Sequence, residues 1–231
     1  MKNYLVSGFL SIICLTVSLG QTDQGYRITG KIENLDDNAK VYLHRGMKRI
    51  DSASVKNGEF VLVGRMTEPA FMYVFVGKGR EAKKIADVLL DNRDVSITGT
   101  KPDYDYVTLT GSDIDQQWKD WYKQDQQVSG QQSRLNKVRQ TLLSKQDTLN
   151  ANVVKQQINE LMEDRIILLK SCVKRRHDSP SGAVLPTLCT LQGRLTRADY
   201  IEMYETLTPK MQATAMGKEI VEQANKTKLI R

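Results

Sequence analysis

The chain has 231 residues, with 34 Lys and Arg against 27 Asp and Glu, and a formal net charge of +7. This length suits one large domain or two small ones. Only two histidines and three cysteines are present, and no Cys-x-x-C pair occurs, which argues against a dithiol redox motif and against a zinc site. The positive excess falls mainly in residues 112–176. A solvated helix face explains it more simply than an anionic partner does.

Residues 1–20 have the pattern of a secretory signal peptide. Lys2 provides the positive n-region, an apolar run of about 15 residues follows, and Gly20 ends a small-residue site for cleavage before Gln21. The apolar run is shorter than the roughly 20 residues that a membrane-spanning helix needs. We therefore predict a mature chain of residues 21–231, periplasmic or otherwise exported, with no transmembrane anchor. Export argues against a nucleic-acid partner.

Cleavage would leave two cysteines, Cys172 and Cys189. An even pair in an oxidising compartment permits one structural disulfide. Both lie in apolar surroundings with a helical pattern, so two buried free thiols fit the sequence equally well. Neither has the Cys-x-x-C neighbour or the helix N-terminal position that lowers the pKa of a catalytic thiol. No catalytic cysteine is predicted.

Residues 21–111 are expected to form an antiparallel β-sandwich. Short runs rich in β-branched and aromatic residues alternate with turn signals, as is typical of a sandwich or barrel. The runs are too short and too evenly spaced for βαβ units. About eight strands are expected. Two of them form a central hairpin within residues 49–65, and the others lie within residues 26–32, 41–43, 71–76, 86–90, 95–98 and 107–110.

The strongest local signal in this region is Asn57-Gly58, which is typical of a two-residue type I′ turn because both positions need φ > 0. Folding about this turn predicts that Lys56 lies opposite Glu59. The two flanking strands would then pair along their length and bury an apolar cluster on one face. The predicted cross-strand pairs are Val55–Phe60, Ala53–Leu62 and Ser52–Val63.

Residues 112–231 are expected to be helical, with a long hairpin over 112–176 and shorter helices over 179–225. Ser112 is a suitable N-cap. Asp125, Gly130 and Gln132 interrupt the first apolar stripe, so only a weak seam between the two helices is expected. The stripes, at spacings of three, four or their multiples, are Ile114, Trp118, Trp121, Val128, Leu135, Val138 and Leu142, then Val154, Ile158, Leu161, Leu168 and Cys172.

Start signals mark the shorter helices. Ser179-Pro180 places Pro at the first helical position, and Pro186 either ends or kinks the helix that follows. The run Thr196–Asp199 resembles a capping box with Asp in place of Glu. Thr208-Pro209 is expected to open the last helix, running through Glu222.

The sequence offers little material for an active site. His44 and His177 have no partners at ligand spacing, and we interpret them as surface or capping residues. The loop 77–80 has glycines and cations that could cradle phosphate, but no helix start follows, so a hairpin loop is expected. Trp118 and Trp121 are expected to pack where the first helix meets the sandwich, a binding patch being the alternative. No catalytic residue, metal ligand or cofactor is predicted.

Short motifs along the chain resemble a known family, the domain-of-unknown-function 4369 family. The motifs in the β region are Tyr26–Ile32, Val41–Leu43, Ile50–Ser52, Val55–Phe60, Gly64 and Glu68-Pro69, and those in the continuation are Gly111-Ser112, Asp178–Ser181, Leu207–Pro209 and Gly217–Glu219. The resemblance implies the N-terminal module of exported thioredoxin-like (ResA/TlpA-type) proteins of Gram-negative bacteria. In those relatives a thioredoxin domain with a W-C-x-x-C site follows about where this chain stops. No catalytic residue of the family can therefore be carried over.

Three functions are consistent with the sequence. The leading hypothesis is an exported, non-catalytic accessory or interaction module of the bacterial cell envelope, with a protein partner. The first alternative is a ligand-binding module that uses the sandwich or its junction with the helices. The second is a component of a thiol–disulfide exchange system whose thioredoxin domain is on another chain. The sequence fixes neither the partner nor the oligomeric state.

Overall fold

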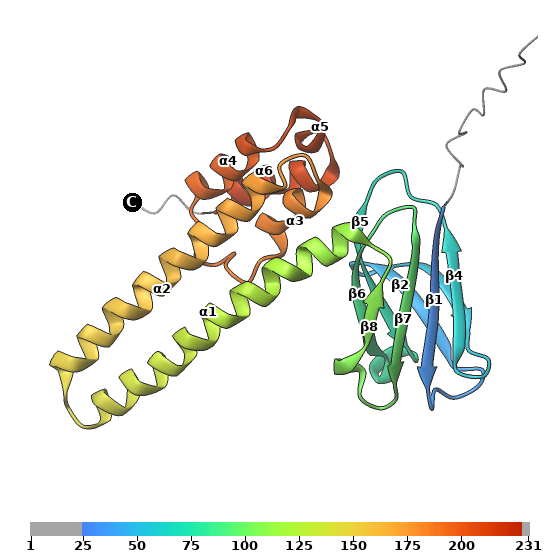
Figure 1. Ribbon diagram of the computed structural model, residues 1–231, viewed down its shortest axis with the longest axis horizontal. Coiled ribbons are helices and arrows are strands. Elements are labelled where there is room, and N and C mark those ends of the chain that lie inside the picture. Colours follow the sequence, from blue (N-terminus) through green and yellow to red (C-terminus); the bar gives the residue numbers. More distant parts are fainter. Residues whose placement is uncertain (1–24, 228–231) are drawn as a thin grey trace, which may run out of the picture.

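The computed structural model describes residues 25–227, in which a β-sandwich is followed by a helical region (Figure 1). The predicted mixed β and α class is confirmed. The predicted signal peptide, with Gly20 and Gln21, lies outside the described residues. Within the described part of the chain, no helix is both long enough and apolar enough to cross a membrane.

The sandwich consists of two four-stranded sheets. Sheet A has the strand order β4-β1-β7-β8, and sheet B has the order β3-β2-β5-β6. All pairings are antiparallel except β1 with β7, which is parallel. The strands are β1 (Tyr26–Glu33), β2 (Lys40–Arg45), β3 (Lys48–Ser54), β4 (Glu59–Gly64), β5 (Ala70–Val76), β6 (Lys83–Leu90), β7 (Asp94–Thr100) and β8 (Thr108–Thr110).

The sandwich core is built from alternate residues of each sheet. In β1 buried and exposed residues alternate strictly from Tyr26 to Glu33, as the period of a strand requires. The inward side chains of both sheets join one apolar cluster, which includes Ile28, Leu43, Phe60, Val74 and Ile97. This burial on facing sheets is the main force that holds the two sheets together.

The central hairpin differs from the prediction in its pairing. Asn57 and Gly58 have φ of +53° and +74°, and Lys56 pairs with Glu59 as a single antiparallel bridge. Beyond that bridge the two strands separate, because β3 pairs with β2 in sheet B and β4 pairs with β1 in sheet A. The predicted ladder is therefore wrong beyond the turn.

The apolar residues of the predicted ladder do lie in the core, but they reach it from different sheets. Ala53 is opposite Val41, whereas Leu62 is opposite Ile28. Val55, Phe60 and Leu62 belong to the sandwich core, with Ala53 packed against it. The turn thus carries the chain across the sandwich, which lets each strand bury its apolar face against the opposite sheet.

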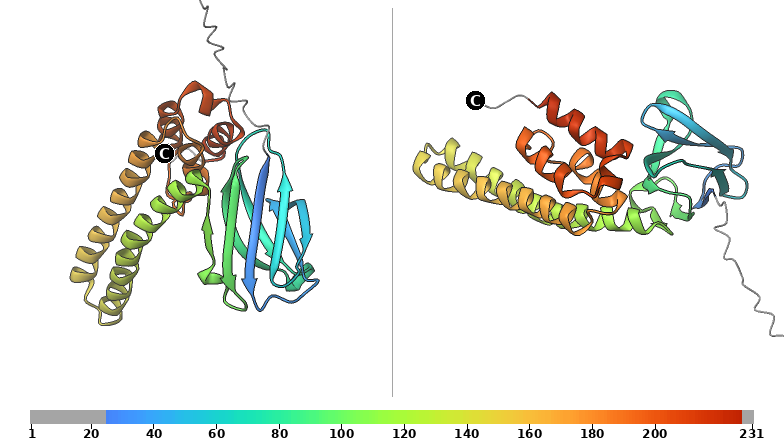
Figure 2. Two further views of the ribbon diagram at one scale, coloured as in Figure 1. Left: turned by 45° about the vertical axis from the view of Figure 1, so that its right-hand side comes forward. Right: turned by 90° about the horizontal axis from the view of Figure 1, so that it is seen from above.

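The helical region begins with a long antiparallel hairpin, formed by α1 (Asp113–Ser144) and α2 (Thr148–Arg175). The far end of this hairpin stands clear of the sandwich in each view of Figures 1 and 2. The remaining helices are α3 (Pro180–Leu188), α4 (Arg197–Thr206), α5 (Pro209–Gln212) and α6 (Ala215–Lys226). Helices α3 and α4 contact α2, and α5 and α6 pack against α3. The C-terminal half of α2 supplies Ile166, Leu169 and Val173 to a second apolar core.

Caps account for most of the helix boundaries. Ser112 caps α1 by accepting a hydrogen bond from the backbone N–H of Asp115, and Thr196 forms the predicted capping box with Asp199. Pro186 lies inside α3 without ending it. The predicted last helix is wrong in one respect, because Thr214 caps a new helix and so divides it into α5 and α6. A threonine that satisfies free N–H groups favours such a break.

The hairpin seam is closed by a buried polar cluster where the sequence suggested interruptions. Asp125 and Gln132 of α1 are buried, and both bind Arg165 of α2. The guanidinium contacts the two carboxylate oxygens of Asp125 at 2.7 and 2.8 Å, and it also binds the Thr190 hydroxyl at 2.8 Å. One buried arginine thus joins α1, α2 and the loop after α3.

Helix α1 meets the sandwich at β6. Leu89 of β6 faces the helical core, while its neighbours Val88 and Leu90 face the sandwich core. Trp118 of α1 packs on Phe71 of β5, with ring centroids 5.1 Å apart, which confirms the predicted role of this tryptophan. This end of the outer face of sheet B is therefore covered by helices, and the other end is not.

Candidate functional site

The residues that the sequence analysis weighed for chemistry do not come together. His44 lies on β2, whereas His177 lies at the end of the long hairpin, where its Nδ1 is 3.0 Å from the Lys174 carbonyl oxygen. Cys172 and Cys189 are both free thiols and both buried. Burial raises the pKa of the Cys189 thiol to about 11. Among residues 25–227, no three His, Cys, Asp or Glu side chains are grouped so that they could hold a metal ion.

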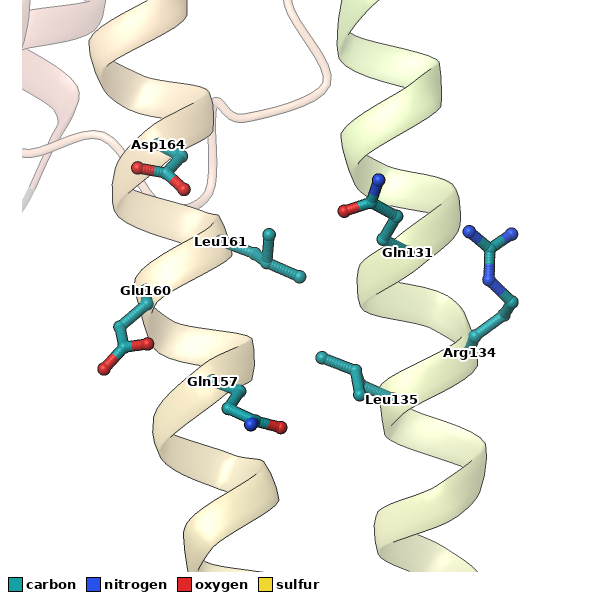
Figure 3. Close-up of a pocket in the computed structure, with 7 residues that line it drawn as sticks. All are labelled: Gln131, Arg134, Leu135, Gln157, Glu160, Leu161 and Asp164. Carbon is teal, nitrogen blue, oxygen red and sulfur yellow. The ribbon is translucent and has the colours of Figure 1, made fainter.

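A groove of about 430 Å³ lies between the two helices of the hairpin. Figure 3 shows Leu135 of α1 and Leu161 of α2 directed into the space between the helices, with polar side chains around them. The charged residues that line this groove are the cation Arg134 and the two carboxylates Glu160 and Asp164. A groove that carries charges of both signs gives little basis for selecting one kind of ligand. We regard it as the less specific of the two candidate sites.

The second candidate is the uncovered end of the outer face of sheet B. Because successive strand residues point to opposite faces, Tyr42 and His44 of β2 and Tyr73 and Phe75 of β5 share the face away from the sandwich core. Tyr42 is opposite Phe75 and His44 is opposite Tyr73. The His44 and Phe75 rings lie 5.2 Å apart, and the Tyr73 and Phe75 rings lie 6.3 Å apart. The four rings form one continuous aromatic cluster.

Cations cover the faces of the two tyrosines. The Arg49 guanidinium lies 5.6 Å from the Tyr42 ring centroid, and the Lys84 ammonium lies 5.9 Å from that of Tyr73. Such stacking is favourable by about 0.5–1 kcal/mol at exposed sites. Lys84 also pairs with Asp87 at 2.8 Å. In the described part of the chain, Arg49 forms no ion pair.

A hollow of about 780 Å³ opens beside this cluster, between the β2–β3 turn and the β5–β6 turn. Its floor includes Tyr42, His44 and Phe75, and its rim includes Met47, whose exposed fraction is 98%. Its charged residues are Arg49 and Lys78, and no carboxylate of the described residues lines it. We call the four rings together with Met47, Arg49, Lys78 and Lys84 the aromatic–cationic face.

The sequence analysis missed this face. The run Phe71–Val76 was predicted to be a strand, but apolar residues at every position do not show which side is buried. One signal was present, because the aromatic residues of this run occupy alternate positions, 71, 73 and 75. The loop 77–80, considered for phosphate, contributes Gly77, Lys78 and Gly79 to the hollow.

The fold defines a mixed β and α protein, in which a β-sandwich precedes a helical hairpin. One outer sheet face of this sandwich carries aromatic side chains and is only partly covered by helices. A family model described as domain of unknown function (DUF4369) matches residues 26–118. The chain therefore contains a domain of this family over those residues, which hold the motifs of the β region, whereas the motifs at 178–219 lie outside the match. The match runs past β8 to Trp118, so it includes the first turns of α1. Among curated proteins, none matches the chain.

Proposed function

We propose that this protein is a non-catalytic interaction module of the bacterial cell envelope, and that the aromatic–cationic face is its contact surface. The observation that supports the proposal is the contrast between the two ends of the same sheet face. At one end Phe71 and Leu89 are covered by α1. At the other end the rings of His44, Tyr73 and Phe75 are only partly buried, and those of His44 and Phe75 line the hollow.

Partly exposed rings beside cations are typical of binding surfaces. Aromatic residues and arginine are enriched at protein–protein interfaces and at the residues that dominate binding energy. The fully exposed Met47 adds a flexible apolar side chain, which adapts readily to a partner. Export of the module remains a proposal that depends on the signal-peptide pattern of residues 1–20.

The thiol–disulfide exchange alternative has less support in the described residues. Exchange requires an accessible thiolate. Cys172 and Cys189 are 0% and 5% exposed, and the raised pKa of Cys189 keeps its thiol protonated at neutral pH. An association with a separate thioredoxin-like protein would make the aromatic–cationic face its docking surface.

Site-specific photo-crosslinking in the source cells tests the proposal. A photoreactive phenylalanine analogue replaces Met47 in one variant and Val63 in another. Val63 is the matched control, because it is 55% exposed and belongs to the edge strand β4 of sheet A. We expect the variant at position 47 to form a discrete adduct that the variant at position 63 lacks. Equal adducts at both positions, or none at either, would contradict the proposed contact surface.

A further inference from the structure

We infer that the aromatic–cationic face binds an acidic peptide segment, extended across the end of sheet B, with carboxylates beside apolar side chains. This inference rests on the proposed function, because it names the class of partner that the same surface selects. Three features of the hollow support it: the sign of its charge, the orientation of its rings and its mixed lining.

The sign of the charge selects an anionic partner. Arg49 and Lys78 line the hollow, and within the described part of the chain no carboxylate does. Elsewhere several described basic residues form ion pairs, such as Lys170 with Asp199 and Glu202. In the described residues no such partner is present for Arg49 or Lys78. An incoming carboxylate would therefore gain charge complementarity without displacing an internal ion pair.

The two tyrosine rings of the face are poorly placed to stack on a sugar polymer. Stacking of a sugar ring needs an open aromatic face. The Tyr42 ring is already covered by Arg49, and that of Tyr73 by Lys84. The Tyr42 side chain is largely shielded, since the residue is only 8% exposed. What the surface presents is a set of cations held above an apolar floor.

The lining of the hollow matches the alternation of an extended peptide. Met47, Phe75 and Ala82 provide apolar contacts, while Arg49 and Lys78 provide the charges. Arginine binds a carboxylate in a bidentate geometry, which adds direction to the contact. In an extended segment successive side chains point to opposite sides, so carboxylates on one side can reach the cations while apolar residues on the other meet the floor.

The test uses fluorescence anisotropy with labelled peptides and the folded protein. The main probe alternates glutamate with leucine, and matched probes carry glutamine or lysine in place of glutamate. Polygalacturonate serves as an anionic sugar competitor. We expect the glutamate peptide to bind about tenfold more tightly than the glutamine peptide, and to weaken as the salt concentration rises.

Charge variants locate the site. Arg49→Gln and Lys78→Gln each remove one cation, and Arg49→Glu reverses it. The matched control is Lys155→Glu on the exposed surface of α2, far from the hollow along the chain. We expect the three hollow variants to weaken binding of the glutamate peptide and the control to leave it unchanged. Thermal unfolding of each variant verifies that the fold is retained.

The outcomes separate this inference from the proposed function. Equal binding of the glutamate and glutamine peptides, or tighter binding of polygalacturonate that Arg49→Glu abolishes, overturns the acidic-peptide inference and leaves an interaction surface in place. If no peptide binds but the crosslinked adduct at position 47 still forms, the acidic-peptide inference is likewise overturned and the interaction surface stands. Loss of both the adduct and the peptide binding overturns the proposed function as well.

Discussion

The Oδ1 atom of Asp115 accepts a hydrogen bond from the backbone N–H of Leu89 at 2.8 Å, and so joins the first turn of α1 to the edge strand β6. The hydroxyl of Ser112 donates to the carbonyl oxygen of the same Leu89 at 2.9 Å. The N-terminal residues of the helix thus satisfy both backbone groups of Leu89. Edge strands need such protection, because free N–H and C=O groups invite pairing with other chains.

Replacement of Asp115 tests this junction. Asp115→Ala would leave the buried N–H of Leu89 without an acceptor, so we expect a loss of about 1–3 kcal/mol in the free energy of unfolding. Asp115→Asn keeps an acceptor oxygen and should lose less. Urea denaturation measures both variants. Equal stability of Asp115→Ala and wild type would show that the junction contributes nothing to folding.

The protonation of Asp115 gives the same comparison a pH dependence. Burial raises the pKa of this carboxyl, and it outweighs the opposing effect of Lys119 at 2.6 Å. Because the carboxyl has a higher pKa in the folded state than in the unfolded state, its protonation stabilises the fold fully at a pH below the unfolded-state pKa. This stabilisation is lost as pH rises through the folded-state pKa. The difference in the free energy of unfolding between wild type and Asp115→Asn should therefore shrink as pH rises from the ordinary pKa of an aspartate to the raised folded-state pKa of Asp115.

The buried pair of Arg165 and Asp125 predicts strong coupling. Their side chains are 8% and 2% exposed, so Arg165→Met alone would leave a buried carboxylate without its partner, at a cost of about 3–5 kcal/mol. The double variant Arg165→Met, Asp125→Leu removes both charges and should recover most of that loss. A double-mutant cycle by chemical denaturation measures the coupling, and additive effects would contradict it.

Two glycines should respond to substitution in opposite directions. Gly58 has φ of +74°, and an added Cβ would lie 2.7 Å from the Ile32 carbonyl oxygen. We expect Gly58→Val to lose about 1–3 kcal/mol from this backbone strain and crowding. Gly130 lies within α1, where an added Cβ has ordinary space, so Gly130→Ala should gain about 0.5–1 kcal/mol. Melting temperatures that move in the same direction would contradict the prediction.

The buried thiol of Cys189 predicts a loss of stability at alkaline pH. Its pKa is raised from 9.0 to about 11 by burial. The stabilising contribution is complete below the unfolded-state pKa, so the free energy of unfolding should fall as pH rises from about 9 to about 11. Cys189→Ala should show a smaller fall over the same range. An identical pH profile for the variant and wild type would show that the thiol titrates normally.

The sequence predicted the elements more reliably than their partners. Asn57-Gly58 defined a turn because both positions need φ > 0, but a turn does not reveal whether its strands share a sheet. Here β3 and β4 belong to different sheets, and the choice depends on burial against β1 and β2, which are distant in sequence. The division at Thr214 was missed because a helix start signal inside a helical pattern is easily read as part of one helix.

The polar seam of the hairpin was partly visible in the sequence. Asp125 and Gln132 were recognised as breaks in the stripe of α1, but they were not paired with a partner. Arg165 follows Leu161 by four residues and precedes Leu168 by three, so it lies on the same stripe of α2. A basic residue on one apolar stripe and an acidic residue on the other is the signal that could have identified the pair.

The candidate site could not be predicted in the same way. Its residues come from β2, β3, β5 and β6 and from the turns that join them. Their proximity depends on the register of β2 against β5, which places Tyr42 opposite Phe75. Which end of this face remains open depends in turn on where α1 packs. Neither relationship is encoded in a local pattern.

The most direct test of the central claim is an NMR titration of protein labelled at its methionine methyl groups. Met47 lines the hollow, whereas Met162 belongs to α2 and packs against the helical core. On addition of the peptide that alternates glutamate and leucine, we predict a saturable shift of the Met47 methyl signal and an unchanged Met162 signal. A shift of Met162 with no change at Met47 would contradict the assignment of the aromatic–cationic face.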